Sequence, residues 1–311
     1  MYKYLVTGGA GFIGSHIAGE LVHRGHSVRI VDNFSTGKKD NIAPFLEKID
    51  LIEGDIKDFE VCHQAAKDMD FVLHQAALTS VPRSIEDPLL TNEVNITGAL
   101  NLLLASRDAG VQRFVLASSA AVYGDNPGLP KKEDMEGLPL SPYAASKRMG
   151  ELYCQVFNRA FGLSTVSLRY FNIFGPRQDP SSQYASVIPN FIGKMLKEEK
   201  PVVFGDGEQS RDFLYVSNVV EANILASQAR EVSGEVFNIG SGEKASINSL
   251  VVKLNEVLDK EIKPTYEEPR PGDIKHSYAD ISKARKMLKY ESSISFSEGL
   301  GETVRWYKEG K

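Results

Sequence analysis

The sequence lacks several features that would assign it to a specialised class of protein. It holds two cysteines among 311 residues, Cys62 and Cys154, far apart in expected helices, which excludes a disulfide framework and paired cysteine metal ligands. No run of lysine and arginine exceeds two residues and the net charge is −5, so we expect no nucleic-acid or membrane partner. No apolar stretch approaches the roughly 18 residues that a membrane span needs.

Motifs of hydrolases and metalloenzymes are missing as well. There is no G-x-S-x-G elbow, no H-E-x-x-H and no cluster of cysteine and histidine, so we expect no metal site. The first residues enter an expected strand directly and leave no room for a signal peptide. Together with the scarce cysteines, this predicts a cytoplasmic protein.

Short β-branched runs alternate with amphipathic segments over the first two-thirds of the chain. The expected strands are Tyr4–Val6, Val28–Val31, Leu51–Glu53, Phe71–His74, Phe114–Ala117 and Thr165–Leu168. The expected helices between them are Ile13–Arg24, Leu89–Ala109 and Pro142–Phe161. This alternation is typical of an α/β protein with a doubly wound (Rossmann) parallel sheet.

After about Arg169 the alternation loosens, which predicts a smaller C-terminal α/β substrate domain. Phe171–Ser186 is rich in Gly, Pro, Asn and Ser and is expected to be a long functional loop. The expected later elements are Val187–Leu196, Val202–Phe204, Tyr215–Ala229, Glu235–Ile239, Ile247–Leu258, Ile281–Leu288 and Phe296–Tyr307. We predict that residues 1–171 and about 214–242 form the Rossmann domain, and that residues 172–213 and 243–311 form the substrate domain.

A glycine-rich turn joins the first expected strand to the first helix. Thr7–Gly14 reads T-G-G-A-G-F-I-G, in which glycines permit the tight turn and let a pyrophosphate approach the helix N-terminus. The second expected strand ends at Asp32, whose carboxylate can bind ribose hydroxyls and would repel a 2′-phosphate. This favours NAD over NADP, although Lys38 and Lys39 follow closely. Asp55 is either an adenine contact or an ordinary N-cap or turn residue.

A tyrosine and a lysine share one face of an expected helix. Ser141 suits the N-cap, and Tyr143 and Lys147 are four residues apart. A phenol is a poor base at neutral pH, but a nearby ammonium, the helix N-terminus and an oxidised nicotinamide would each favour the phenolate. Ser119 follows an expected strand at the carboxyl edge of the sheet, where it can hydrogen-bond a reacting hydroxyl.

Together these residues resemble the extended short-chain dehydrogenase/reductase superfamily over essentially the whole chain. Within it the sequence is most similar to the UDP-hexose 4-epimerases, above all those that act on UDP-N-acetylglucosamine. Besides the motifs above, the segments that carry the likeness are His74–Ala77, Ser80–Ser84, Leu168–Gly175, Gly205–Gly207, Ser210–Phe213 and Gly272–Ser277.

The resemblance implies a mechanism and a set of site residues. Tyr143 would take the proton of the sugar 4-hydroxyl while NAD accepts the C4 hydride, and the hydride would return to the other face of a transient 4-keto sugar. Lys147 and Ser119 would assist Tyr143. The implied cofactor residues are Gly8, Gly11, Phe12, Ile13, Gly14, Asp32, Asn33, Asp55, Ile56, Gln75, Ala76, Ala77, Tyr143, Lys147 and Tyr170. The implied substrate residues are Ser80, Ser84, Ser119, Tyr143, Asn172, Arg211, Arg270, Asp273 and Ser277.

Two departures within the resemblance bear on the reaction and the substrate. Related dehydratases and decarboxylases carry acidic residues after the position of Ser119, where this chain has Ala120 and Ala121. Dehydration is therefore not expected. Ser277 stands at a position that is bulky in enzymes restricted to plain hexoses, so its small side chain predicts room for an N-acetyl group. Plain UDP-glucose and UDP-galactose remain possible substrates, because one pocket position is worth only about 1–3 kcal/mol.

Two alternatives keep the same fold. A UDP-hexuronic acid 4-epimerase would need a further cation near the sugar, for which Arg83 is the candidate. A non-catalytic NAD-binding regulatory protein is disfavoured by the joint presence of Ser119, Tyr143 and Lys147. The resemblance also implies a homodimer through Leu89–Ala109 and Tyr143–Phe161, although these apolar faces could equally form the core.

Overall fold

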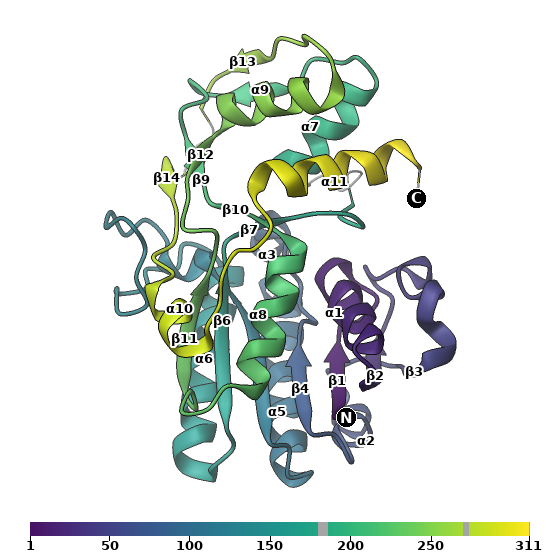
Figure 1. Cartoon of the computed structure of the whole chain (residues 1–311). Helices are drawn as coiled ribbons and strands as arrows, with labels where there is room; N and C mark the ends of the chain where they lie inside the picture. Colours follow the sequence, from purple (N-terminus) through teal and green to yellow (C-terminus); the bar gives the residue numbers. More distant parts are fainter. Residues whose placement is uncertain (180–185, 270–273, 311) are drawn as a thin grey trace.

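The computed structural model describes residues 1–179, 186–269 and 274–310. A seven-stranded parallel sheet forms its centre, in the order β11-β6-β5-β4-β1-β2-β3 (Figure 1). The strands are β1 (Lys3–Thr7), β2 (Ser27–Asp32), β3 (Ile49–Glu53), β4 (Phe71–His74), β5 (Arg113–Ser119), β6 (Thr165–Tyr170) and β11 (Glu235–Ile239). The order reverses between β1 and β4, and the carboxyl ends of strands at such a point are the usual ligand site. The predicted doubly wound fold is confirmed.

Helices cover both faces of this sheet and bury two apolar clusters. The helices are α1 (Phe12–His23), α2 (Phe59–Ala66), α3 (Val81–Glu86), α4 (Pro88–Asn92), α5 (Gly98–Asp108), α6 (Pro142–Phe161), α8 (Val216–Gln228) and α10 (Ser282–Leu288). Shorter turns are η1 (Lys39–Asn41), η2 (Ala43–Lys48), the π-helical η3 (Glu93–Thr97) and η4 (Ala120–Tyr123). One cluster joins the sheet to α1, α8 and α10, and the other joins it to α2, α5 and α6.

A smaller unit lies beyond the carboxyl edge of the sheet (Figure 1). Its elements are β7 (Asn172–Phe174), α7 (Val187–Leu196), β8 (Val202–Phe204), β9 (Ser210–Arg211), β10 (Phe213–Tyr215), β12 (Ala245–Ser246), α9 (Ile247–Leu258), β13 (Thr265–Glu267), β14 (His276–Ser277) and α11 (Phe296–Lys308). A third apolar cluster holds α7, α9 and α11 together. No helix within the described ranges is both long and apolar enough to span a bilayer.

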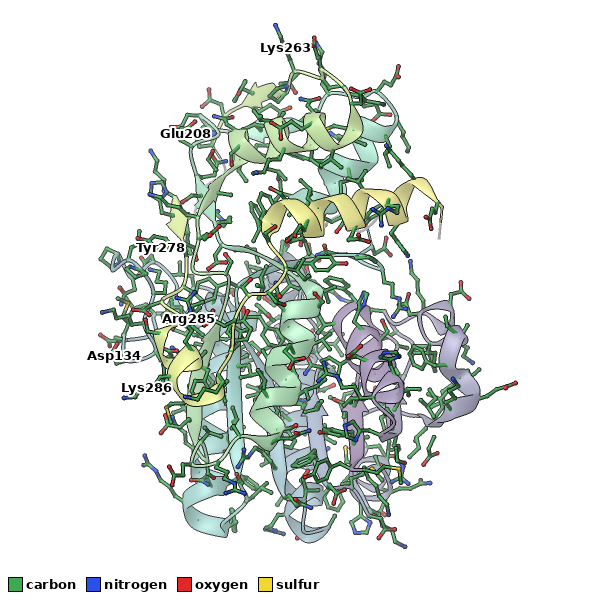
Figure 2. The ribbon with its side chains drawn as sticks, in the orientation of Figure 1. Asp134, Glu208, Lys263, Tyr278, Arg285 and Lys286 are labelled. Carbon is green, nitrogen blue, oxygen red and sulfur yellow. The ribbon has the colours of Figure 1, made fainter. Side chains whose placement is uncertain are left out.

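The chain returns from this unit to the large sheet after β14. Figure 2 shows Tyr278 between Glu208 of the smaller unit and Arg285 of α10. Residues such as Ala279, Ala284 and Tyr290 are buried in the cluster of the large sheet. Part of the segment 243–311, which the sequence predicted to belong to the substrate domain, therefore packs with the core of the large sheet.

Most predicted elements agree with the structure to within a few residues. Pro142–Phe161 is helical as predicted, with the Ser141 hydroxyl accepting a hydrogen bond from the Ala144 amide and Gly162 ending the helix at φ 71°. Two differences stand out. The expected helix Leu89–Ala109 is divided by the π-helical η3, and the expected loop Phe171–Ser186 contains β7.

Candidate active site

The glycine turn between β1 and α1 is shaped to receive a pyrophosphate. Gly8 has φ +65°, and a Cβ on Gly14 would lie 2.1 Å from the Gly8 carbonyl oxygen. Helix α1 starts at Phe12, its N-cap Gly11 provides no side-chain acceptor, and its first turn has no acidic residue. The first N–H groups of α1 are thus left to an external anion, as at other dinucleotide sites.

Acidic side chains border this turn on the side of β2 and β3. The Asp32 carboxylate accepts hydrogen bonds from the Ala10 amide at 2.9 Å and the Phe34 amide at 2.8 Å. The Asn33 amide donates to Asp55 at 3.0 Å, and Asp55 also accepts from the backbone of Lys57. Asp55 is therefore a turn residue in this structure, and a contact with adenine remains a prediction.

A polar cluster lies on the opposite side of the glycine turn, at the ends of β4 and β6. The Tyr170 hydroxyl lies 3.1 Å from Gln75 Oε1 and from Asn223 Oδ1, and Gln75 Nε2 donates to Asn223 at 3.0 Å. A Cβ on Gly8 would lie 2.8 Å from the Ala76 backbone, which brings the glycine turn against the end of β4. The glycine turn, the Asp32 carboxylate and this polar cluster fit NAD: Asp32 would bind a ribose, and Tyr170 and Gln75 would also contact the cofactor.

Ser119, Tyr143 and Lys147 converge at the ends of β5 and α6. The Ser119 hydroxyl lies near the Tyr143 side chain, and it accepts from the Ala121 amide at 3.1 Å. The Lys147 ammonium donates to the Ala117 carbonyl at 2.8 Å and lies 5.9 Å from the centre of the Tyr143 ring. The three residues predicted to act together are thus neighbours.

The electrostatics of the tyrosine depend on its burial. Burial raises the pKa of Tyr143, and the nearby Ser119 hydroxyl opposes this rise without reversing it. Burial also lowers the pKa of Lys147 to about 8, so the ammonium is still mostly protonated at neutral pH and loses its proton just above it. Burial by itself therefore raises the pKa of this phenol, and its acidification beside an oxidised nicotinamide stays a prediction. The protonated Lys147 and a bound cationic nicotinamide would each favour the phenolate.

His74 adds a neutral group beside the lysine. Burial, with a contribution from the Lys147 charge, lowers the pKa of His74 to about 3. Its Nδ1 lies 2.7 Å from the Thr7 hydroxyl, which also accepts from the Ala76 amide at 3.3 Å. The neutral ring of His74 and the Thr7 hydroxyl thus share a hydrogen bond whose donor depends on the tautomer of the ring.

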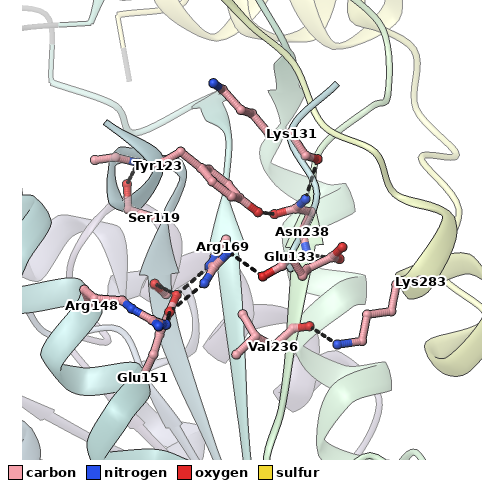
Figure 3. Close-up of polar contacts among 12 residues, drawn as sticks. Ser119, Tyr123, Lys131, Glu133, Arg148, Glu151, Arg169, Val236, Asn238 and Lys283 are labelled. Atoms are coloured by element: carbon pink, nitrogen blue, oxygen red, sulfur yellow. Dashed lines mark hydrogen bonds and ion pairs between the residues drawn. The ribbon is translucent and has the colours of Figure 1, made fainter. Parts of the chain in front are cut away.

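A buried ion pair fixes α6 against the strands that end at the site (Figure 3). Glu151, one turn beyond Lys147, accepts from Arg169 Nε at 2.8 Å and Arg169 Nη2 at 2.9 Å. The Ser118 hydroxyl donates to the same carboxylate at 2.6 Å. Because Ser118 precedes Ser119, this network connects the strand of the serine with the helix of the tyrosine and the lysine.

Three of the predicted substrate residues lie where the smaller unit meets the sheet. Ser277 of β14 pairs in register with Arg211 of β9, and Asn172 of β7 donates its backbone N–H to the Asp212 carbonyl at 3.0 Å. The Asp212 carboxylate is buried and accepts from the amides of Ser241, Gly242 and Ala279. Strands β9 and β14 are thereby tied to the loop after β11.

Other predicted residues are engaged locally or lie elsewhere. Ser80 caps α3 by accepting from the Arg83 amide at 3.2 Å, and buried Ser84 donates to the Val81 carbonyl at 2.6 Å. Their contact with a substrate remains a prediction. Arg83, the candidate cation for a uronic acid, has an exposed side chain. Arg270 and Asp273 lie outside the described residues.

Sequence reasoning missed Glu151, Arg169 and Asn223. No local motif marks them, because their partners are distant in sequence and each looks like an ordinary helix or strand residue. The spacing of Glu151 from Lys147, four residues along one helix face, was the one signal present in the sequence.

Comparison with known proteins places the chain among enzymes of nucleotide sugars. Residues 4–240 match the model of the NAD dependent epimerase/dehydratase family. The UDP-glucose 4-epimerase of Mycolicibacterium smegmatis is 35% identical over 310 residues, which cover 98% of each chain. The structure of UDP-N-acetylglucosamine 4-epimerase from Methanobrevibacter ruminantium, in complex with UDP-N-acetylmuramic acid, is similar with a TM-score of 0.96 and 44% identity, covering 100% of this chain and 99% of that one. The NAD complex of the UDP-glucose 4-epimerase from Thermus thermophilus has a TM-score of 0.90 and 38% identity, with 99% and 100% covered.

Proposed function

Because this chain belongs to the NAD-dependent epimerase/dehydratase family and is an NAD-dependent UDP-sugar 4-epimerase, we propose that it interconverts UDP-N-acetylglucosamine and UDP-N-acetylgalactosamine. We also expect it to act on UDP-glucose and UDP-galactose. The observation that carries the choice of sugar is the small side chain of Ser277, in register with Arg211 at the join between the two units.

Each catalytic side chain has a defined task in this reaction. Tyr143 removes the proton of the sugar 4-hydroxyl, and Ser119, whose hydroxyl lies near the Tyr143 side chain, shares the path of that proton. Bound NAD supplies the hydride acceptor, and later the donor, at C4. Lys147, held by the Ala117 carbonyl, adds positive charge beside the phenol when protonated and holds the nicotinamide ribose. Return of the hydrogen to the opposite face of a 4-keto sugar inverts C4.

The residues after Ser119 restrict the chemistry to epimerisation. Ala120 and Ala121 open η4 and carry no acid that could protonate a leaving hydroxyl. Retention of the C6 hydroxyl and of the carbon skeleton is the expected consequence. A mass spectrum of the product should therefore equal that of the substrate, and loss of water or of carbon dioxide would contradict the assignment.

The size of the side chain at position 277 tests the choice of sugar. NMR of purified enzyme with each UDP-sugar, without added NAD, should reveal inversion at C4 for the N-acetylated and the plain pairs. Ser277→Tyr should lose roughly tenfold or more in kcat/KM for UDP-N-acetylglucosamine and keep UDP-glucose, in line with about 1–3 kcal/mol for a misfit in a pocket. Ser277→Ala, which stays small, is the matched control and should keep both.

One result would reject the proposed substrate, and another would reject the role of Ser277 in choosing it. The first is turnover of UDP-glucuronate without turnover of any N-acetylated sugar. The second is equal turnover of UDP-N-acetylglucosamine by Ser277→Tyr and the wild type, which would remove Ser277 from the pocket.

We further propose that the enzyme is a homodimer formed through α6 and α4. Leu89 of α4 is 76% exposed and Val156 of α6 is 52% exposed, and the nearby Met149 and Leu152 are also exposed. The apolar face of α5, by contrast, is buried in the core through Leu102 and its neighbours. Sedimentation should give a dimer for the wild type and a monomer for Val156→Glu, and an unchanged mass would exclude this surface.

A further inference from the structure

A short segment after β7 crosses over the cofactor side of the large sheet. This segment, Pro176–Asp179, has a contact with α1 or the loop before η1 at three of its four residues. The Pro176 carbonyl accepts from His16 Nε2 at 3.0 Å, and Arg177 Nη1 donates to the Ser15 hydroxyl at 3.2 Å. We call Pro176–Asp179 the strap.

The partners of the strap belong to the two motifs that hold a dinucleotide. Ser15 and His16 follow the glycine turn in the first and second turns of α1. Lys38, which pairs with Asp179 at 3.0 Å, lies in the loop after Asp32, and its backbone N–H donates to the Ala10 carbonyl at 3.0 Å. The strap therefore connects the expected pyrophosphate end of the site with the expected ribose end.

The charge of Arg177 has no acidic partner within the described ranges. Its guanidinium donates to the neutral Ser15 hydroxyl, and none of the ion pairs of the described residues includes it. Ser15 lies three residues beyond Phe12, the first residue of α1, which is about 4.5 Å along the helix axis. The guanidinium that contacts Ser15 is therefore near the N-terminal end of the helix. A cation at the positive end of a helix is repelled unless an anion lies between them.

The neighbouring histidine responds to the same charge. Burial lowers the pKa of His16 to about 4, and the Arg177 charge contributes to this fall. His16 is thus neutral at physiological pH, and its Nε2 carries the proton that is donated to Pro176. Arg177 is therefore charged at this place, and His16 beside it is not.

The backbone of the strap is held in a conformation that side chains rarely adopt. Arg177 has φ 67°, which a non-glycine residue seldom takes unless its surroundings impose it. The next residue is anchored on both sides, because the Tyr307 hydroxyl donates to the Gln178 carbonyl and Gln178 Nε2 donates to the Ile173 carbonyl at 3.2 Å. The contacts of Gln178 with the smaller unit therefore hold the backbone so that the Arg177 guanidinium points toward α1.

We propose that Arg177 is a ligand of the cofactor pyrophosphate and that the strap retains NAD between catalytic cycles. The guanidinium fork can pair with two oxygens of a diphosphate. It adds a full positive charge to the N–H groups that α1 offers the same anion. Retention suits a reaction that returns NAD to its starting state in every cycle. The proposal rests on NAD as the cofactor and on no choice of sugar.

The test measures NAD release from the full-length holoenzyme by exchange with labelled NAD, independently of any sugar. Arg177→Gln should release NAD roughly tenfold to hundredfold faster, the effect of one lost charge-assisted contact. Arg177→Lys, which keeps the charge without the fork, should fall between this variant and the wild type. Arg230→Gln, the same change at an exposed arginine outside the strap, should leave the rate unchanged.

Two competitors separate a phosphate contact from a purely steric role. The affinity of Arg177→Gln for ADP-ribose should fall by the same factor as its affinity for NAD, while that for adenosine stays constant. Equal NAD release by Arg177→Gln and the wild type would overturn the proposal. So would a parallel loss of adenosine affinity, because adenosine has no phosphate for the arginine to bind.

Discussion

Removal of the carboxylate at position 151 should destabilise the large sheet strongly. Glu151→Ala takes away the acceptor shared by Arg169, Ser118 and Arg148 (Figure 3). We expect a loss of about 3–5 kcal/mol in the free energy of unfolding, the usual cost of breaking a buried pair from one side. This is a large part of the roughly 5–15 kcal/mol that holds most proteins folded.

The burial of each partner determines this magnitude. The side chain of Glu151 is 0% exposed and that of Arg169 is 3% exposed, so the truncation leaves the Arg169 charge without its counter-charge inside the protein. Its other contacts are a long hydrogen bond to the Glu133 carbonyl at 3.3 Å and a cation–π contact with the Tyr123 ring at 4.7 Å, and neither supplies a full negative charge. Arg148, at 35% side-chain exposure, can turn to water and adds little.

Urea unfolding followed by circular dichroism on NAD-free protein measures the loss. Glu302→Ala breaks the exposed Glu302–Arg305 pair, at 51% and 66% side-chain exposure, and should cost less than about 1 kcal/mol. The reasoning fails if Glu151→Ala costs no more than this control. It also fails if Arg169→Ala is equally costly with and without Glu151, because no coupling would then exist.

The Glu151–Arg169 pair also predicts how the free energy of unfolding depends on pH. Burial raises the pKa of Glu151, but hydrogen bonds and charge from Arg169 outweigh burial, and the net pKa is lowered. Glu151 therefore stabilises the fold fully above its unfolded pKa of about 4.3, and this contribution is lost as the pH falls through the lower native value. The stability difference between wild type and Glu151→Gln should shrink on acidification, and a difference that stays constant from neutral to strongly acidic pH would contradict the assignment.

Further expectations follow from single positions of the active site. Tyr143→Phe should bind NAD normally and lose roughly 100-fold or more in turnover, whereas near wild-type turnover would mean that another group is the base. Gly14→Ala should fail to retain NAD in gel filtration, because its Cβ would lie 2.1 Å from the Gly8 carbonyl oxygen, and normal retention would show that the turn can widen. Burial lowers the pKa of Lys147 to about 8, so this group favours the fold increasingly as pH rises from about 8 towards its unfolded value. Lys147→Met should remove that gain from NAD-free protein, and an unchanged pH–stability curve would refute the burial argument.

Much of this protein follows from contacts between residues close together in the chain. The glycine turn, the N-cap Ser141 and the spacing of Tyr143 from Lys147 are local patterns, and a turn or a helix needs only its own few residues to form. Apolar alternation likewise predicts which segments become buried strands. The order of elements, and hence the meeting of Ser119 with Tyr143 at one edge of the sheet, follows from the rules of parallel α/β folds.

Tertiary packing decided what the local patterns leave open. Arg169 pairs with Glu151, one of many carboxylates in the chain, because folding buries both side chains at the same place. No rule of sequence spacing connects a strand residue with a residue of a distant helix. The pKa of Tyr143 likewise depends on how deeply the fold buries its side chain, which no local spacing reveals. The strap reaches α1 across more than a hundred residues of chain, since long-range contacts arise from shape and charge that form only after folding.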